Sequence, residues 1–302
     1  MKFYLFIILL SISLSSHTYA HVVTDKLMSG IIESHQKNIA YIGWTMQGQL
    51  YWFNSNDKIV YQKEYEIIRL YDVFNSGSAY YLLASKHTEN VADTVLMINS
   101  SGNISSEWRF DNGITSMNVS GHNATVIQHR TLITLQPHGK TSLKDDSFDA
   151  DFILGDINNN PIKCKKPDLH KQSYQPGICS REGKSNWSVT GQWRNANWPI
   201  WCGDYLIEKG FYKHFSKDRF IKVTSTQNGE EVITKKVHKG QVVNCTGSRV
   251  LYSGKSLFLA EPQTLKTIKK VSVKNLPVWS AIIIGTAVYY VDGIGKLNKS
   301  IL

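Results

Sequence analysis

The feature that most constrains the fold is a short hairpin pattern that recurs along the chain. Each copy has an apolar strand, a turn of Asn, Asp, Gly, Ser or Pro, and a more polar strand, as in Leu-Tyr-Trp-Phe-Asn-Ser-Asn-Asp-Lys-Ile-Val-Tyr from Leu50. β-Branched and aromatic residues on both sides of a turn that needs permissive backbone angles indicate a β-hairpin. Further copies begin at Leu96, Leu132, Phe220, Leu257 and Val288. The chain is therefore predicted to be a repeated all-β protein.

The spacing of the copies indicates how many repeats there are. Neighbouring copies begin 31 to 46 residues apart, but 88 residues separate Leu132 from Phe220. A gap of about twice the usual step predicts one more hairpin in its middle, and Ile178–Val189 has the required pattern. Units of about 40 residues with three to four strands are typical of β-propeller blades. We expect residues 21–302 to form a single β-propeller of seven blades, with six or eight blades as alternatives.

Two other all-β folds also produce many short strands. A pair of β-sandwich domains gives strands at similar spacing, but it does not require a doubled gap to be filled by another hairpin. A β-helix is the second alternative. Helix signals are scarce, and residues 25–36 are expected to form either a short helix or the strand that closes a propeller ring.

The repeats resemble those of a known family. The apolar strand, the Asn/Asp-Gly turn and the polar return strand are similar to the repeats of the broad YVTN/PQQ-like family of β-propellers, over most of residues 35–302. PQQ-type repeats carry a tryptophan after the turn, which is matched in this chain by Trp108 and Trp187, and no Trp-Asp dipeptide occurs. The resemblance implies the architecture, and we expect no cofactor and no metal site.

The N-terminus has the three parts of a secretory signal peptide. Lys2 supplies a positive charge, Phe3–Leu14 is an apolar run too short to span a bilayer, and Thr18 and Ala20 occupy the small-residue positions of a cleavage site. Residues 1–20 are therefore predicted to be removed. The mature chain is expected in a periplasm or a secreted location, without a transmembrane segment.

Export makes disulfides the expected state of the four cysteines, although four cysteines allow three connectivities. Cys164 and Cys179 flank a polar loop, while Cys202 and Cys245 precede successive hairpins and would meet between adjacent blades. We therefore favour these two pairs. We also expect residues of about 157–202 to form a disulfide-bearing insertion in the propeller.

Half of the eight tryptophans lie within one stretch of 15 residues, 187–201, which follows that loop. We predict a binding site formed by Trp187, Trp193, Arg194, Trp198 and Trp201, because flat aromatic rings interleaved with polar groups suit a sugar or another extended ligand. The alternative is that the large rings fill the space between adjacent blades.

The charge of the chain is concentrated in one segment. Of a formal net charge of +10, residues 205–275 carry fourteen Lys or Arg against five Asp or Glu. Such a face attracts anionic partners, and we expect a protein or anionic glycan partner and no nucleic acid. The alternative is that Lys235, Lys236, Lys269 and Lys270 occupy solvent faces and edges of strands.

Seven sequons would carry glycans if the source glycosylates its secreted proteins. They are at Asn99, Asn103, Asn118, Asn123, Asn186, Asn244 and Asn298. Catalytic signals are weaker, because there is no Gly-x-Ser-x-Gly elbow and the histidines show no triad spacing. The sequence thus favours an exported, non-enzymatic binding or scaffold module, with no catalytic residues. The alternative is a secreted or periplasmic hydrolase or oxidoreductase with its site at the mouth of a central channel.

Overall fold

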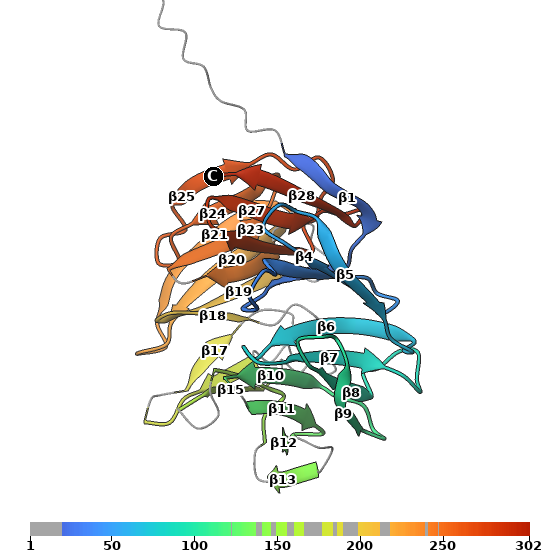
Figure 1. Ribbon diagram of the computed structural model, residues 1–302. Coiled ribbons are helices and arrows are strands. Elements are labelled where there is room, and N and C mark those ends of the chain that lie inside the picture. Colours follow the sequence, from blue (N-terminus) through green and yellow to red (C-terminus); the bar gives the residue numbers. More distant parts are fainter. Residues whose placement is uncertain are drawn as a thin grey trace, which may run out of the picture.

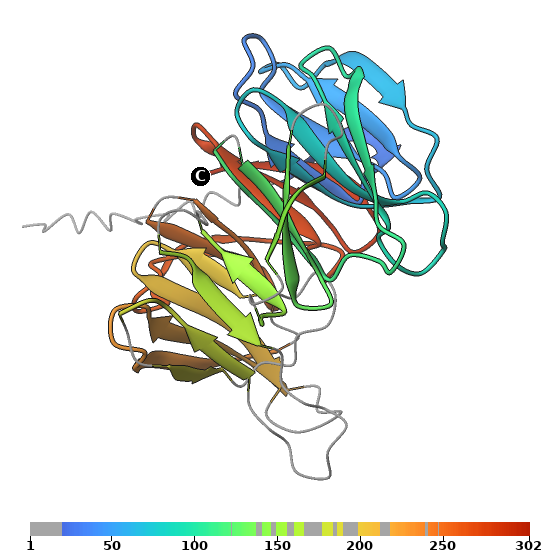
Figure 2. The same ribbon diagram turned by 90° about the horizontal axis from the view of Figure 1, so that it is seen from below.

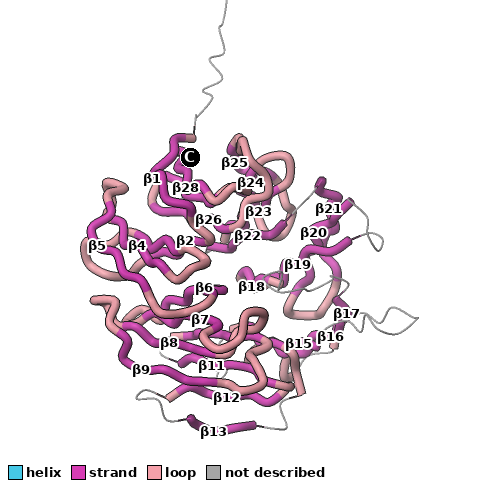
Figure 3. Tube along the Cα trace, turned by 90° about the vertical axis from the view of Figure 1, so that its right-hand side faces the viewer, coloured by secondary structure: helices cyan, strands magenta, loops and turns pink. Residues whose placement is uncertain are grey.

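The computed structural model shows a ring of seven four-stranded antiparallel sheets (Figures 1 and 3). This confirms the predicted all-β, seven-bladed β-propeller. The signal peptide predicted for residues 1–20 lies, except for Ala20, outside the described residues. The structure describes residues 20–302 apart from 122, 137–140, 146–148, 156–159, 166–176, 184–185, 190–198, 212–217, 239–240 and 247.

Six blades are built from four consecutive strands each, and in every one of them the first strand is the innermost and the fourth is the outermost. Blade one is β2 (Gly30–Glu33), β3 (Tyr41–Trp44), β4 (Gln49–Phe53) and β5 (Ile59–Glu64). Blade two is β6 (Arg69–Asn75), β7 (Tyr80–Ser85), β8 (Thr94–Ile98) and β9 (Ile104–Arg109). Blade three is β10 (Ser116–Ser120), β11 (Asn123–Gln128), β12 (Thr131–Leu135) and β13 (Thr141–Asp145).

The next three blades follow the same order. Blade four is β14 (Phe152–Leu154), β15 (Ile162–Lys165), β16 (Gly177–Ser180) and β17 (Trp187–Val189). Blade five is β18 (Ile200–Cys202), β19 (Tyr205–Phe211), β20 (Asp218–Ser225) and β21 (Glu231–His238). Blade six is β22 (Gln241–Thr246), β23 (Arg249–Ser253), β24 (Leu257–Ala260) and β25 (Thr267–Val271).

The seventh blade joins the two ends of the described chain. Its strands are β26 (Ser280–Ile284), β27 (Ala287–Val291), β28 (Lys296–Ile301) and, as the outermost strand, β1 (His21–Leu27). Figure 2 shows the red strands of this blade between the blue and the orange blades. The closing strand expected within residues 25–36 therefore exists, but it begins earlier, and residues 30–33 form the inner strand of blade one instead.

All seven predicted hairpins are present, with one difference in position. In blades one to six the predicted hairpin joins the third and fourth strands. The copy at Val288 joins the second and third strands, β27 and β28, because the fourth strand of that blade comes from the opposite end of the sequence.

The hairpin turns show why these residues end one strand and begin the next. In blade one, the side-chain oxygen of Asn54 accepts the N–H groups of Asn56 and Lys58 at 3.0 and 3.1 Å. The backbone of Asp57, with φ of 61°, closes the turn. An Asn side chain that replaces a backbone acceptor, followed by a residue with positive φ, specifies a tight turn locally. The same bonding pattern recurs in Asn99–Asn103 and Asp292–Lys296.

The core lies between adjacent blades. Trp52 of blade one and Leu82 of blade two belong to one cluster and are 1% and 0% exposed. Trp108, which follows the turn in the second repeat, packs with Ala124 and Ile133 of blade three. Full burial of such a side chain contributes on the order of 2 kcal/mol. Each blade is thus stabilised mainly by its neighbours, as in other repeat architectures.

Candidate functional site

The inner strands are joined to one another by side-chain bonds to backbone groups. The Asn244 amide of β22 donates to Ala281 O of β26 at 2.9 Å. Ser280 of β26 bonds to both backbone groups of Ile31 of β2, at 3.2 Å each. These bonds satisfy polar groups that face the next blade, and they fix the relative positions of the inner strands.

Two disulfides add to these bonds, and both predicted pairs are confirmed. Cys202 of β18 is bonded to Cys245 of β22, so this disulfide links the inner strands of blades five and six. Cys164 and Cys179 are directly opposite each other on β15 and β16, within blade four. The segment expected as an insertion, residues 157–202, carries β15 to β18 as strands of two blades.

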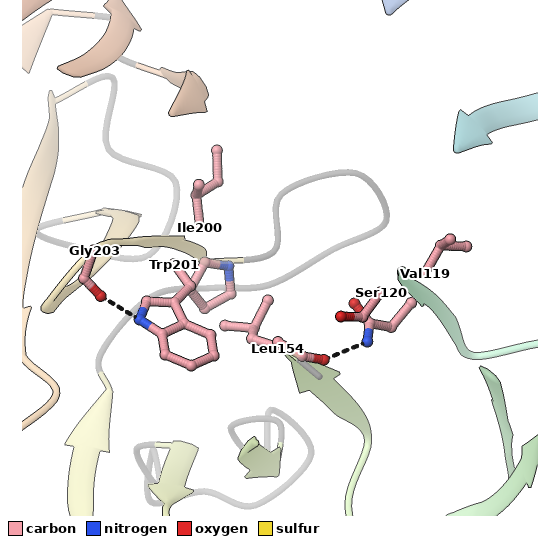
Figure 4. A pocket seen from close by; sticks show the side chains of 9 residues that line it. Val119, Ser120, Leu154, Ile200, Trp201 and Gly203 are labelled. Carbon is pink, nitrogen blue, oxygen red and sulfur yellow. Dashed lines mark hydrogen bonds between the residues drawn. The ribbon is translucent and has the colours of Figure 1, made fainter. Parts of the chain in front are cut away.

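An open hollow lies where the inner strands of blades three, four and five meet (Figure 4). Its volume is about 560 Å³, within the usual range of ligand pockets. β14 and β18 have only three residues each. The hollow is lined by Asn118, Val119, Ser120, Leu154, Gly155, Pro199, Ile200, Trp201 and Gly203.

Trp201 forms the wall of the hollow on the side of blade five. Its indole N–H donates to Gly203 O, as Figure 4 shows, and the Arg181 guanidinium lies 5.2 Å from the ring. The ring also lies directly against Gly155, where an added Cβ would be only 1.9 Å from a ring carbon. Glycine at 155 is therefore required both by this close approach and by its φ of +84°.

Blade three contributes the opposite wall. The Asn118 amide donates to Gly155 O at 2.7 Å, and the Ser116 hydroxyl donates to Asp151 O at 3.2 Å. These two bonds hold β10 beside β14. Val119 and Ser120, at the end of β10, are half-buried and face the hollow.

The tryptophans that are adjacent in sequence are distributed over two blades. Trp187 is on β17, the outermost strand of blade four, whereas Trp201 is on β18, the innermost strand of blade five. Trp193, Arg194 and Trp198 lie outside the described residues. Of the two predicted binding residues that the structure describes, Trp187 and Trp201, the second lines the hollow.

The lysine pairs of the basic segment lie on outer strands. Lys235 and Lys236 are on β21, and Lys269 and Lys270 are on β25, the outermost strands of blades five and six. The Lys235 ammonium donates to Tyr252 OH and to a backbone carbonyl of blade six, at 3.0 and 3.2 Å. None of these four lysines lines the hollow.

Titratable groups with displaced pKa values are scattered. Burial raises the pKa of Asp72, on inner strand β6, to about 6. Burial, with the nearby Arg219 charge, lowers the pKa of Lys209, on β19, to about 8. These two groups belong to blades two and five and do not form a shared site. Within the part of the chain that the structure describes, no three His, Cys, Asp or Glu side chains are arranged to hold a metal ion, and no helix is long and apolar enough to cross a bilayer.

The predicted glycosylation asparagines fall into two groups. Asn99, Asn103 and Asn186 are exposed, and the side chain of Asn123 lies outside the described residues. Asn118 and Asn244 donate to neighbouring inner strands, and Asn298 is 8% exposed. A glycan on any of these last three would displace contacts within the fold.

Several residues of the hollow have no local signal in the sequence. Val119, Leu154 and Ile200 are ordinary apolar residues of short strands, about 40 residues apart in the chain. In the sequence Asn118 is part of a sequon, whereas in the structure its amide donates a hydrogen bond from blade three to blade four. One signal that could have been used is the recurrence of Asn at similar places in the inner strands, at Asn118 and Asn244.

Comparisons with known proteins place the chain among β-propellers at the level of fold. No family model matches the sequence, and no curated protein sequence matches it. BamB from Moraxella catarrhalis is similar in structure, with a TM-score of 0.59 and 11% identity over 95% of this chain and 99% of that one. The WD40 domain of Neurospora crassa Pan2 has a TM-score of 0.62 and 12% identity, covering 90% of this chain and 88% of that one. The resemblance thus includes BamB and a WD40 domain, and at these identities it shows the fold alone.

Proposed function

We propose that this chain is an exported, non-enzymatic β-propeller that binds a protein or glycan partner. The observation that carries the proposal is the open hollow lined by Trp201, on a ring whose inner strands are joined by hydrogen bonds and a disulfide. A surface that is fixed before binding loses little conformational entropy when a partner docks, and this favours affinity. β-Propellers serve many functions, so the fold supports a binding role without naming the partner.

Two observations support export. Cys164–Cys179 and Cys202–Cys245 account for all four cysteines, as expected in an oxidising compartment. The first strand of the fold, β1, begins at His21, directly after the predicted cleavage site.

The proposal is tested by substituting Trp201. Wild type and Trp201→Ala would be applied to a glycan array that includes anionic glycans and to an immobilised peptide library. We expect the wild type to retain a defined set of ligands, and Trp201→Ala to bind them at least about tenfold more weakly, because a central aromatic residue carries much of an interface's energy.

Trp279→Ala is the matched control, because Trp279 is 52% exposed beside inner strand β26 on the other side of the ring. This variant should bind like wild type. Circular dichroism and thermal unfolding would establish that both variants are folded. Binding by Trp201→Ala that equals wild type, or no ligand for wild type on either surface, would refute the proposal.

A further inference from the structure

The turn between β27 and β28 carries an isoleucine where two similar turns of this chain carry polar residues. Asp292 accepts the N–H groups of Ile294 and Lys296 at 3.2 and 2.9 Å. In the two turns with the same bonding pattern, the residues at the position of Ile294 are Asn56 and Ser101. The Asp292 bonds specify the turn, so it does not require an apolar residue at its tip. Ile294 is nevertheless 53% exposed there.

Two further segments at the same end of blade seven add exposed apolar side chains. The Trp279 N–H donates to Val291 O at 2.9 Å, directly before the turn. Leu27 lies opposite the first residue of β28, directly after the turn. Trp279 and Leu27 are 52% and 60% exposed. Leu27, Trp279 and Ile294 thus lie on three segments that contact one another, and we call this surface the blade-seven rim.

Positive charge surrounds the blade-seven rim. Lys26, Lys274 and Lys296 lie on the same three segments, and all three are exposed. Residues 21–29 and 241–302, which form blades six and seven and the link to blade one, carry nine Lys or Arg against three Asp or Glu. Such an excess attracts an anionic partner.

The three acids of these blades leave the rim basic. Glu261 lies in the turn between β24 and β25, at the opposite end of blade six. Asp292 is 3% exposed and is bonded within its own turn, so Asp25 is the exposed acid near the rim. The structure describes residues 20–121 and 248–302 without a gap, and these ranges contain the rim and the segments around it.

An anionic bilayer surface fits this combination better than an acidic protein does. Side chains that project from turns enter a bilayer interface without a matching shape, because headgroups and acyl chains close around them. Tryptophan is favoured at that interface, and lysine reaches lipid phosphates while its stem stays among apolar groups. A protein partner would need a separate pocket for each projecting side chain.

We propose that the blade-seven rim docks on the surface of an anionic phospholipid bilayer. Leu27, Trp279 and Ile294 insert among the headgroups, and the neighbouring lysines pair with lipid phosphates. In a blade of four antiparallel strands the last strand ends where the first begins, so the inner strands all start at this face of the ring. The hollow is lined by Ser120 and Gly155, at the other ends of β10 and β14, and therefore lies toward the face away from the bilayer.

The test is a flotation assay of the disulfide-bonded protein with vesicles of equal parts phosphatidylglycerol and phosphatidylcholine. Vesicles of phosphatidylcholine alone are the comparison. We expect binding to the anionic vesicles to be at least about tenfold tighter, because each lysine near an anionic surface contributes about fivefold. Leu27→Ser combined with Ile294→Ser should weaken that binding at least about tenfold, because binding scales with the apolar area that is buried.

Ile301→Ser is the matched control. Ile301 is 48% exposed at the opposite end of blade seven, so this variant should bind vesicles like wild type. Lys274→Gln combined with Lys296→Gln should weaken binding to the anionic vesicles and leave binding to phosphatidylcholine unchanged. Thermal unfolding checks that each variant folds, and if the Leu27 and Ile294 double variant does not, Ile294→Ser alone replaces it.

Three results would overturn the inference: equal binding to both kinds of vesicle, unchanged binding by the Leu27 and Ile294 variant, or binding to immobilised poly-L-glutamate as tight as to the anionic vesicles. The last result would assign the rim to an acidic protein. The inference does not depend on the proposed function, which is tested at Trp201 without lipid. Trp279→Ala therefore remains a valid control in that experiment, and either proposal can fail without the other.

Discussion

At the scale of single residues, Asp93 shows how one buried carboxylate organises a loop. It is 3% exposed and accepts the N–H groups of Lys86, His87 and Thr88 at 2.8 to 3.0 Å. It also accepts the hydroxyls of Thr88 and Thr94. Burial alone would raise the pKa of Asp93, but these hydrogen bonds outweigh burial and hold it below its usual value.

Asp93→Asn is expected to lower the free energy of unfolding by about 1–3 kcal/mol at pH 7, because one oxygen acceptor is replaced by a donor that faces other donors. A depressed folded-state pKa contributes stability above the unfolded pKa of about 4, and this contribution is lost as pH falls through the folded value. The difference between variant and wild type should therefore shrink in acid.

Urea unfolding of both proteins at pH 7 and at progressively lower pH measures this difference. Glu89→Gln is the matched control, since Glu89 is an exposed acid of the same loop, and it should change stability little. A difference for Asp93→Asn that is independent of pH would contradict the assigned role.

Residue chemistry also explains which parts of the fold were predictable. Turns such as Asn54–Lys58 are specified by their own side chains, so the hairpins could be read from the sequence. The hollow could not be, because Val119, Leu154 and Ile200 meet only through the ring. Proximity in sequence does not reveal that Trp187 and Trp201 belong to different blades, with Trp187 on the outermost strand of blade four and Trp201 on the innermost strand of blade five.

At the scale of elements, the turn between β4 and β5 ties blade one to the closing blade. Asp57, in this turn, accepts hydrogen bonds from the Tyr289 hydroxyl of β27 at 2.9 Å and from the Lys299 ammonium of β28 at 2.7 Å. The Tyr41 hydroxyl donates to the same carboxylate at 3.2 Å. The Asp57 and Lys299 side chains are only 15% and 18% exposed. The contact therefore helps to hold blade one against the closing blade, in which strands from the two ends of the described chain are paired.

Asp57→Ala should lower the free energy of unfolding by about 3 kcal/mol, because it leaves a largely buried ammonium without its partner. Asp111→Ala provides the comparison, since Asp111 forms an exposed pair with Arg109 and its side chain is 88% exposed. That substitution should cost less than about 1 kcal/mol.

Guanidinium unfolding of the two variants measures both values. Equal effects of Asp57→Ala and Asp111→Ala would show that the contact at the junction has no special role in stability.

At the scale of the whole molecule, the ring depends on its two ends and on its cysteines. β1 pairs with β28, and His21 lies opposite Lys299 at the start of the closing strand. Ala20 packs against the cluster that joins blades six and seven. The blade number was predictable, because spacing along the chain reflects a repeated unit. The place of the last hairpin was not, because closure by β1 is a contact between opposite ends of the sequence.

Export, as proposed above, would remove residues 1–20 and leave a chain that begins at β1, with its four cysteines oxidised to the two disulfides of the closed ring. Mass spectrometry of the mature protein from its natural source, with non-reducing peptide mapping, tests this most directly. We expect an N-terminus at His21, disulfides Cys164–Cys179 and Cys202–Cys245, and no free thiol. A mature chain that retains residues 1–20, lacks β1, or contains reduced or differently paired cysteines would contradict it.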